Sequence, residues 1–124
     1  MNIERFEDLE AWQEARRATN SIYDLTTRDG FRGDFRLRDQ ITGAAVSVMN
    51  NIVEGFMSQS DPEFIRFLGY ARRSTSEVQT CLYVALDRKY ISQEEFHRAY
   101  GQAEKTRKVV DGFLRYLRRS KRRK

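Results

Sequence analysis

The sequence predicts an all-α fold, an antiparallel up-and-down four-helix bundle, from three observations. Apolar residues recur at steps of three and four along most of the chain, as on the inner face of an amphipathic helix. No segment shows the strict alternation of a half-buried strand. The 124 residues include one proline, and 33% are charged, a composition that suits long helices facing water. Short joins between the helices favour antiparallel neighbours, and the length fits one domain.

The first helix is expected over residues 8–27. Its inner row consists of Ala11, Ala15, Ala18, Ile22 and Leu25, with Leu9, Trp12 and Tyr23 beside it. Two glycines follow within residues 29–33, and they predict a turn that separates this helix from the next.

The second helix is expected over residues 37–56 and carries two rows at helical spacing. The apolar row is Leu37, Ile41, Ala45, Val48, Ile52 and Phe56. The other row, turned by about 100° around the helix, is mostly polar and consists of Gln40, Ala44, Ser47, Asn51 and Glu54. A helix with one water-facing side needs only the apolar row, so we expect this helix to be enclosed on two sides. The polar row Gln40, Ser47, Asn51 and Glu54 is then either a ligand or partner site or a structural hydrogen-bond network, and the network is the simpler interpretation.

Helix-start signals precede the last two helices. Ser60 and Ser92 each stand three residues before a glutamate, Glu63 or Glu95, which is the spacing of a capping box. The third helix is expected to end near residue 89 or 90, and its inner row is Phe64, Leu68, Ala71, Thr75, Val78, Leu82 and Ala85. The row of the fourth helix is Phe96, Tyr100, Ala103, Val110, Leu114 and Leu117. Arg107 interrupts this row and is expected to reach outward or to meet an acid.

Apolar side chains outside these rows have two interpretations, a wide core or an interface between subunits. They include Phe67, Tyr70, Tyr83, Phe113 and Tyr116. Three glycines, Gly69, Gly101 and Gly112, also lie inside the expected helices, where each costs up to about 1 kcal/mol relative to Ala. Close approach of a neighbouring helix is the compensation that we expect.

Basic residues are concentrated at the C-terminal end. The last ten residues hold seven of the 23 Lys and Arg and no acid, so residues 1–114 hold 16 basic and 18 acidic residues, a net charge of −2. This divides the chain into a bundle over residues 1–114 and a basic helix end and tail over residues 115–124. The favoured interpretation is contact with nucleic-acid phosphates, and the alternatives are acidic protein partners or solubility alone. The candidate residues are Arg115, Arg118, Arg119, Lys121, Arg122, Arg123 and Lys124, with Arg16, Arg17, Arg72 and Arg73 as further cations.

The sequence offers no catalytic, metal or cofactor site. Glu94 and His97 have the spacing of half a di-iron site, but such a site needs two of these motifs and His97 is the single histidine. Cys81 lies on an apolar face with no base to activate it. The uncharged part of the second helix is too short and too polar to span a bilayer, the first residues lack a signal-peptide pattern, and one cysteine fits a reducing compartment. We therefore expect a non-enzymatic cytoplasmic protein without metal, cofactor or membrane contact.

Four stretches resemble a family of bacterial four-helix-bundle proteins. They are FEDLEAWQEA at residues 6–15, QITGAAVSVMNNIVEGF at residues 40–56, EFIRFLGYARRSTSEVQTCLYVAL at residues 63–86, and Tyr90-Ile91. The family includes proteins encoded in intervening sequences of 23S ribosomal RNA genes and the accessory variability proteins of diversity-generating retroelements. Its most specific pattern is met at Ser47, Asn51, Ile52, Glu54 and Gly55.

The resemblance implies a bundle assembled as a homopentamer with a central channel and without known catalytic activity. In the retroelement branch it also implies a partner reverse transcriptase and binding of template RNA or cDNA. Gly43, Met49 and Arg73 depart from the family, which usually has Arg, Pro and Gly there, and Met49 predicts a straighter second helix. The expected function is a non-enzymatic oligomeric nucleic-acid-binding accessory protein of a reverse transcriptase. The alternative is a structural or protein-interaction bundle of the ribosomal intervening-sequence type, with no nucleic-acid role.

Overall fold

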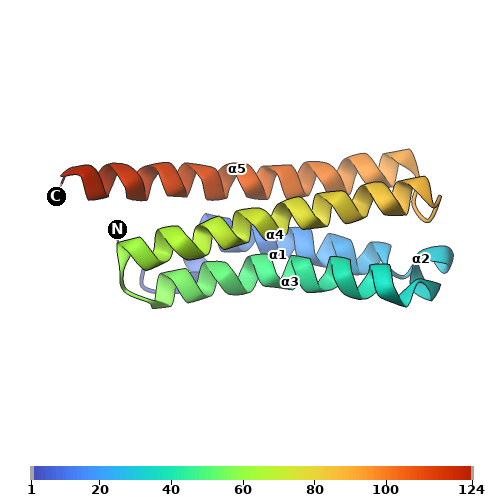
Figure 1. Cartoon of the computed structure of the whole chain (residues 1–124), viewed down its shortest axis with the longest axis horizontal. Helices are drawn as coiled ribbons and strands as arrows, with labels where there is room; N and C mark the ends of the chain where they lie inside the picture. Colours follow the sequence, from blue (N-terminus) through green and yellow to red (C-terminus); the bar gives the residue numbers. More distant parts are fainter. Residues whose placement is uncertain (1, 124) are drawn as a thin grey trace.

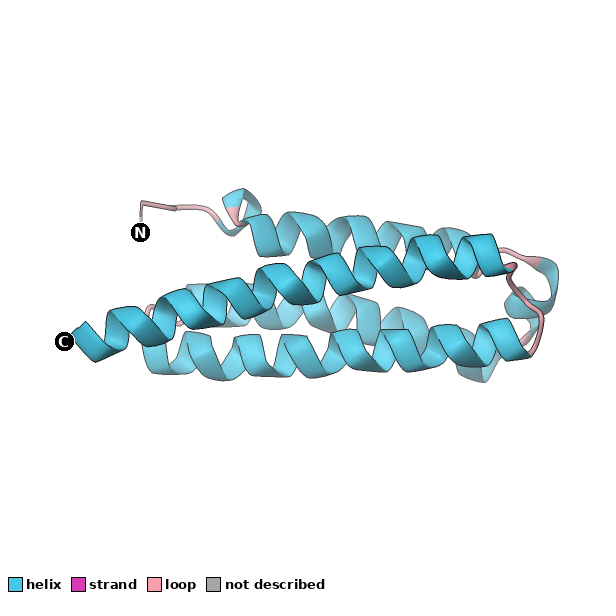
Figure 2. Ribbon diagram, turned by 90° about the horizontal axis from the view of Figure 1, so that it is seen from above, coloured by secondary structure: helices cyan, strands magenta, loops and turns pink. Residues whose placement is uncertain are grey.

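Four long helices form the molecule in a computed structural model that describes the backbone of residues 2–123 and the side chains of residues 2–120. They are α1 (Glu10–Leu25), α3 (Phe35–Met57), α4 (Asp61–Asp87) and α5 (Gln93–Arg123). A short 3-10 helix, η1 (Phe6–Asp8), precedes α1, and a short helix, α2 (Asp29–Gly33), joins α1 to α3. Helices α1 and α4 each pack against both α3 and α5 (Figures 1 and 2). Over the described residues the fold is the antiparallel four-helix bundle that the sequence predicts.

Serine caps begin α4 and α5. Ser92 and Glu95 form a complete capping box, in which Ser92 N donates to Glu95 Oε1 at 2.9 Å and Glu95 N donates to Ser92 Oγ at 3.0 Å. At α4, Ser60 Oγ accepts from Glu63 N at 3.4 Å. The Glu63 carboxylate accepts from Arg66 instead of closing the box. The capping-box prediction is therefore confirmed in full at Ser92 and for one bond at Ser60.

The predicted break between α1 and α3 is confirmed, but residues 29–33 within it form the short helix α2, which was not predicted. Within α2, Phe31 is fully buried and contacts the ring of Tyr90 at a centroid distance of 5.8 Å. The Tyr90 hydroxyl donates to Asp34 Oδ2 at 3.0 Å. A Cβ atom on Gly30 would lie 2.6 Å from Tyr90 Cδ1, so this glycine allows the tyrosine ring to pack closely against the connection.

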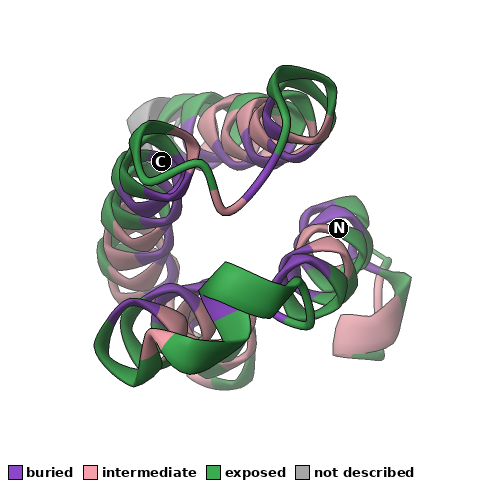
Figure 3. Cartoon of the chain, turned by 90° about the vertical axis from the view of Figure 1, so that its right-hand side faces the viewer, coloured by how far each residue is buried: buried purple, intermediate pink, exposed green. Residues whose placement is uncertain are grey.

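The core consists of two apolar clusters with a small cavity between them. One cluster lies near α2 and includes Phe31 and Leu82, and the other lies toward the C-terminal end of α5 and includes Leu68 and Val110. Mostly small side chains line the cavity between the two clusters: Ala15, Ala18, Thr19, Ile22, Ala45, Val48, Thr75, Val78, Ala103 and Thr106. This cavity measures about 10 Å³, which is close to the smallest volume that can hold one water molecule. Buried faces of all four long helices turn toward this axis (Figure 3).

The predicted inner rows match the buried residues of α4 but not all of those in α5. Every member of the α4 row, from residue 64 to residue 85, is buried. In α5 every member of the predicted row except Tyr100 is buried. Ala99 and Thr106, which the row does not contain, are buried as well, each one residue before the half-buried Tyr100 or Arg107.

Side chains outside the inner rows divide between the two interpretations. Phe67, Tyr70 and Phe113 are half-buried, and Phe113 packs against the core with its ring centroid 4.9 Å from that of Phe64. Tyr83 is 50% exposed and Tyr116 is 44% exposed, so these two rings do not widen the core of the single chain. Tyr23, expected beside the inner row of α1, is also exposed.

The glycines inside the helices do not mark close helix contacts. Apart from the local helix backbone, no described atom lies within 4 Å of the position of a Cβ on Gly69 or Gly101, and the position on Gly112 is approached at 3.7 Å by the Arg115 guanidinium. The expected compensation is therefore absent within the described part of the chain. Gly55 does need its small size, because a Cβ there would lie 2.7 Å from Phe64 Cδ1.

A buried carboxylate joins α1 to α5. Only 5% of Glu14 is exposed. Its Oε1 accepts from Gln102 Nε2 at 2.9 Å, its Oε2 accepts from Arg17 at 2.8 Å, and Lys105 Nζ lies 3.7 Å away. The hydrogen bond from Gln102 and the charges of Lys105 and Arg17 outweigh desolvation and lower the pKa of Glu14. The carboxylate is thus held ionised between the two helices.

Candidate nucleic-acid interface

A groove of about 390 Å³ runs between α4 and α5 toward the C-terminal end of α5. Its lining consists of Gly69, Arg72 and Arg73 from α4 and Asp111, Leu114, Arg115 and Arg118 from α5. Four arginines thus surround one aspartate. We call this feature the basic groove. It brings together two of the cationic segments that the sequence predicts as candidate sites, although about 40 residues of chain separate them.

Helical spacing places these side chains on facing surfaces. On α5, Asp111, Leu114 and Arg118 follow one another at steps of three and four, which puts them along one side of the helix. Leu114 is 4% exposed and anchors this side in the core. On α4, Gly69 has no side chain and leaves open space between the arginines. The basic groove is therefore deeper at Gly69 than it would be with a side chain at that position.

Asp111 accounts for only part of the positive charge. Its Oδ1 lies 2.7 Å from Arg72 Nε, and its Oδ2 lies 3.0 Å from Arg107 Nη1. Arg115 and Arg118 form no ion pair with any acid among the described side chains. The basic groove therefore has a net positive charge, because four arginines and a single carboxylate line it. That carboxylate is already shared by the guanidinium groups of Arg72 and Arg107.

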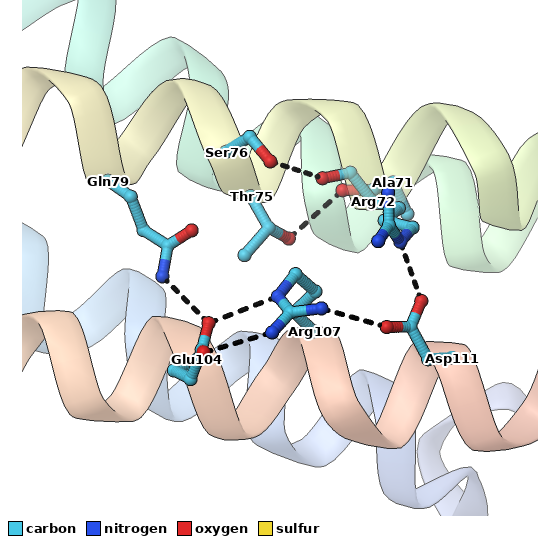
Figure 4. A network of polar contacts seen from close by, with 8 residues as sticks. All are labelled: Ala71, Arg72, Thr75, Ser76, Gln79, Glu104, Arg107 and Asp111. Carbon is cyan, nitrogen blue, oxygen red and sulfur yellow. Dashed lines mark hydrogen bonds and ion pairs between the residues drawn. The ribbon is translucent and has the colours of Figure 1, made fainter.

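A polar network continues from the basic groove along the same seam (Figure 4). Arg107 donates twice to Glu104, at 3.0 and 2.9 Å, and Glu104 Oε1 also accepts from Gln79 Nε2 at 3.1 Å. The bonds from Arg107 and Gln79 lower the pKa of Glu104 to about 2. The prediction that Arg107 meets an acid is confirmed. The steps of three and four from Glu104 to Arg107 to Asp111 were a signal for this network that the sequence prediction did not use.

Helix α5 extends past the start of α4 at this end of the molecule (Figures 1 and 2). It continues without a break to Arg123, and Leu117, a member of the predicted row of this helix, is 3% exposed. Arg115, Arg118 and Arg119 are exposed. The predicted site residues Lys121, Arg122, Arg123 and Lys124 lie outside the range of described side chains.

The other predicted cations on α1 lie away from the basic groove. Arg17 pairs with the buried Glu14 at 2.8 Å. The guanidinium of Arg16 lies 5.7 Å from the centre of the Trp12 ring. Neither residue lines the basic groove. The structure therefore brings Arg72 and Arg73 to the C-terminal basic residues, but not Arg16 and Arg17.

The polar row of α3 divides into two parts. Ser47 and Asn51 are half-buried and form a small network, in which Asn51 Nδ2 donates to Ser47 O and Oγ at 2.8 and 3.0 Å and Ser47 Oγ lies 3.0 Å from Ser74 Oγ on α4. Gln40 and Glu54 are exposed. The expectation that a second side of this helix is enclosed is therefore wrong at both ends of the row within a single chain.

The residues considered for metal or thiol chemistry lie apart. His97 is exposed and contacts the ring of Phe96. Burial, with the nearby charge of Glu77, raises the pKa of the Cys81 thiol. Within the described residues no three His, Cys, Asp or Glu side chains are grouped to hold a metal ion. No helix of that range has an apolar stretch long enough to cross a membrane.

These features define a class of small all-α proteins, four-helix bundles with an elongated last helix and a cationic end. The family model described as 23S rRNA-intervening sequence protein matches residues 7–112, so the chain belongs to this family. The match ends before Arg115 and Arg118, while Arg72 and Arg73 lie inside it. The part of the predicted resemblance that concerns this ribosomal family is therefore confirmed.

A solved structure supports the same fold. The chain is similar to the crystal structure of a protein with unknown function from the S23 ribosomal protein family of Bacteroides thetaiotaomicron VPI-5482. The TM-score is 0.78 at 19% sequence identity, covering 85% of this chain and 95% of that chain. No match was found among curated proteins.

Proposed function

We propose that this protein is a non-enzymatic cytoplasmic nucleic-acid-binding protein that holds the phosphate backbone of RNA or DNA in the basic groove and along the C-terminal end of α5. The observation that supports this most directly is the convergence of Arg72, Arg73, Arg115 and Arg118 around one open hollow. Among the described acids only Asp111 shares that hollow.

Guanidinium groups suit this role because their planar forks bind phosphate oxygens in pairs and stay charged at any cellular pH. Each phosphate neutralised releases counterions, so the affinity falls steeply with salt. Contacts to phosphate fix the position of a nucleic acid but do not read its bases. The binding that we propose uses the arginines of the basic groove for such contacts and is independent of sequence.

Self-association and a reverse-transcriptase partner complete the proposal. The exposed rings of Tyr83 and Tyr116 and the exposed Gln40 and Glu54 on α3 support contacts with further copies. Five copies, the number that the family resemblance implies, would gather five sets of the seven basic residues over positions 115–124 and raise the affinity through effective concentration. Light scattering coupled to size exclusion tests the assembly, and a monomer would contradict it. Co-purification with a reverse transcriptase encoded beside the gene tests the partner.

The experiment compares a triple variant, Arg115→Gln, Arg118→Gln and Arg119→Gln, with wild type by fluorescence anisotropy of labelled RNA across a salt series. We expect the slope of log affinity against log salt to fall by about 2 to 3, since each phosphate contact contributes roughly 0.7 to 0.9. The matched control removes three cations at the opposite end of the molecule: Arg88→Gln, Lys89→Gln and Arg98→Gln. Equal losses in both variants, or wild type that binds no RNA at low salt, would contradict the proposal.

The alternative function is a bundle that binds another protein and no nucleic acid. The exposed Phe35 and Met57 at the two ends of α3, at 65% and 61%, favour it. Partner binding that survives the triple substitution but is lost with Phe35→Ser or Met57→Ser would support this alternative.

A further inference from the structure

An aromatic surface adjoins the basic groove on α4. The ring of Tyr70 is flanked by two guanidinium groups, those of Arg66 and Arg73, at 5.5 and 5.8 Å from its centroid. Phe67 lies edge-on to Tyr70 at 5.8 Å, with Arg66 over its ring at 4.8 Å. Arg66 Nη1 also donates to the Tyr70 hydroxyl at 3.1 Å. Two rings and two cations thus form one surface cluster.

Arg73 belongs to both the aromatic cluster and the basic groove. Because successive residues turn by about 100° around a helix, the order on the surface of α4, starting from α5, is Arg72, Gly69, Arg73, Tyr70 and Phe67. Tyr70 therefore lies just beyond the edge of the basic groove, together with Arg66, whose guanidinium donates to the Tyr70 hydroxyl. A chain that extends from that groove past Arg73 would next meet the Tyr70 ring and the Arg66 guanidinium.

The rings are held firmly enough to act as a platform. Phe67 and Tyr70 are both half-buried. The Phe67 Cβ lies 3.1 Å from the position that a Cβ on Gly55 would occupy, so the side chain packs closely against the end of α3. Tyr70 is held by the Arg66 bond and by the edge of Phe67. The two rings therefore lose little conformational freedom when a ligand binds.

Phosphate-binding cations beside partly exposed aromatic rings are an arrangement by which proteins bind single strands, because unpaired bases stack on aromatic rings and on guanidinium planes. A duplex hides its base faces and can use only the cations. We infer that the nucleic acid bound here is single-stranded, with a base stacked on Tyr70 while adjoining phosphates bind Arg73, Arg115 and Arg118. This inference rests on the proposed function and names its substrate class.

The test compares Tyr70→Leu, which removes the ring, with Tyr70→Phe, which removes only the hydroxyl. Tyr23→Leu on α1, where Tyr23 is also exposed, is the matched control. Probes are a labelled oligouridine and an RNA duplex of equal phosphate number, measured by anisotropy at one salt concentration. We expect Tyr70→Leu to weaken single-strand binding roughly 5- to 100-fold, the range for losing one stacked base. Duplex binding, and both probes with Tyr70→Phe or Tyr23→Leu, should change by less than about twofold.

A second measurement uses the unmodified protein. Oligouridine carrying 5-bromouracil is irradiated in the complex, and the crosslinked residue is mapped by mass spectrometry. We expect the crosslink at Tyr70 or Phe67. A crosslink confined to other residues, or a Tyr70→Leu variant that weakens both probes equally or neither, would overturn the inference while leaving phosphate binding in the groove intact. Wild type that binds neither probe would instead overturn the proposed function.

Discussion

Two stretches of the seam between α4 and α5 use arginine in opposite ways. In the middle of the seam, Arg107 lies between Glu104 and Asp111, and every charge faces a partner (Figure 4). Toward the C-terminal end, Arg115 and Arg118 line the basic groove without an acid of their own among the described side chains. After Asp111 the sequence contains no further acid. The placement of two acids therefore decides whether an arginine holds two helices together or remains available to an external anion.

Arg72 stands at the boundary between the two stretches. Its guanidinium pairs with Asp111 at 2.7 Å and also lines the basic groove. An incoming phosphate therefore competes with one carboxylate for this side chain, whereas it meets Arg115 and Arg118 directly.

The largest effect is expected from removing the apolar support beneath the basic groove. Leu114→Ala should destabilise the protein by about 2 to 4 kcal/mol, because it deletes a side chain that is 4% exposed and leaves a cavity. Urea denaturation measures this loss. Tyr116→Ala, two residues away and 44% exposed, is the control and should cost far less. Similar losses for the two variants would show that α5 is not packed at this end as described.

Breaking the paired stretch should have a smaller effect on stability. Arg107→Met is expected to cost about 1 kcal/mol, because Glu104 and Asp111 lose the cation between them while the network is still partly hydrated. The control is Arg98→Met, whose ion pair with Glu94 is fully on the surface. Urea midpoints that fall equally for both variants would mean that the paired stretch contributes nothing beyond an ordinary surface pair.

The paired stretch should also make stability depend on pH. The pKa of Glu104 is lowered from 4.5 to about 2 in the folded state, so ionisation of this carboxyl group stabilises the folded state relative to the unfolded state. This contribution is present above pH 4.5 and is lost as the pH falls from about 4.5 to 2. Since 34% of the Glu104 side chain is exposed, we expect a loss of about 1 kcal/mol or less. Urea midpoints between pH 5 and pH 2.5 should fall less for Glu104→Gln than for wild type, and parallel curves would contradict the assignment.

The smallest effect is expected at the boundary. Asp111→Asn should raise the affinity for RNA by roughly two- to fivefold, because it removes the one described carboxylate in the basic groove and releases Arg72. Anisotropy measures the change. Glu94→Gln alters the net charge equally at the far end of α5, where the Glu94 side chain is 84% exposed, and should leave the affinity unchanged. An equal gain from both would mean that net charge, not the basic groove, controls binding.

Most of the fold could be predicted from local patterns. The inner row of α4 and the capping box at Ser92 and Glu95 depend on residues close in sequence, and both are present as predicted. The errors fall where a distant contact decides the outcome. The helical connection at residues 29–33 depends on Tyr90, which is far along the chain. The inner face of α5 includes Thr106, which periodicity of apolar residues does not select.

The basic residues of the candidate site could be predicted from the sequence, but not which of them meet at one groove. The excess of basic residues is plain in the sequence, and so is the pair Arg72 and Arg73. Their meeting at one groove depends on how far α5 is shifted along α4, and no residue pattern encodes that shift directly. The role of Gly69 was also beyond the sequence, because a glycine that opens a hollow looks the same as one that admits a neighbour.

The buried Glu14 has a consequence for that alignment. Its carboxylate is matched to Gln102 and Lys105 on α5, so sliding α5 by one turn, about 5.4 Å, would leave the buried carboxylate with only Arg17 of its own helix as a partner. The loss of these two partners disfavours such a displacement of α5 along the bundle axis. Glu14 thus helps to fix the height at which Arg115 and Arg118 meet Arg72, although it lies on a helix that takes no part in the groove.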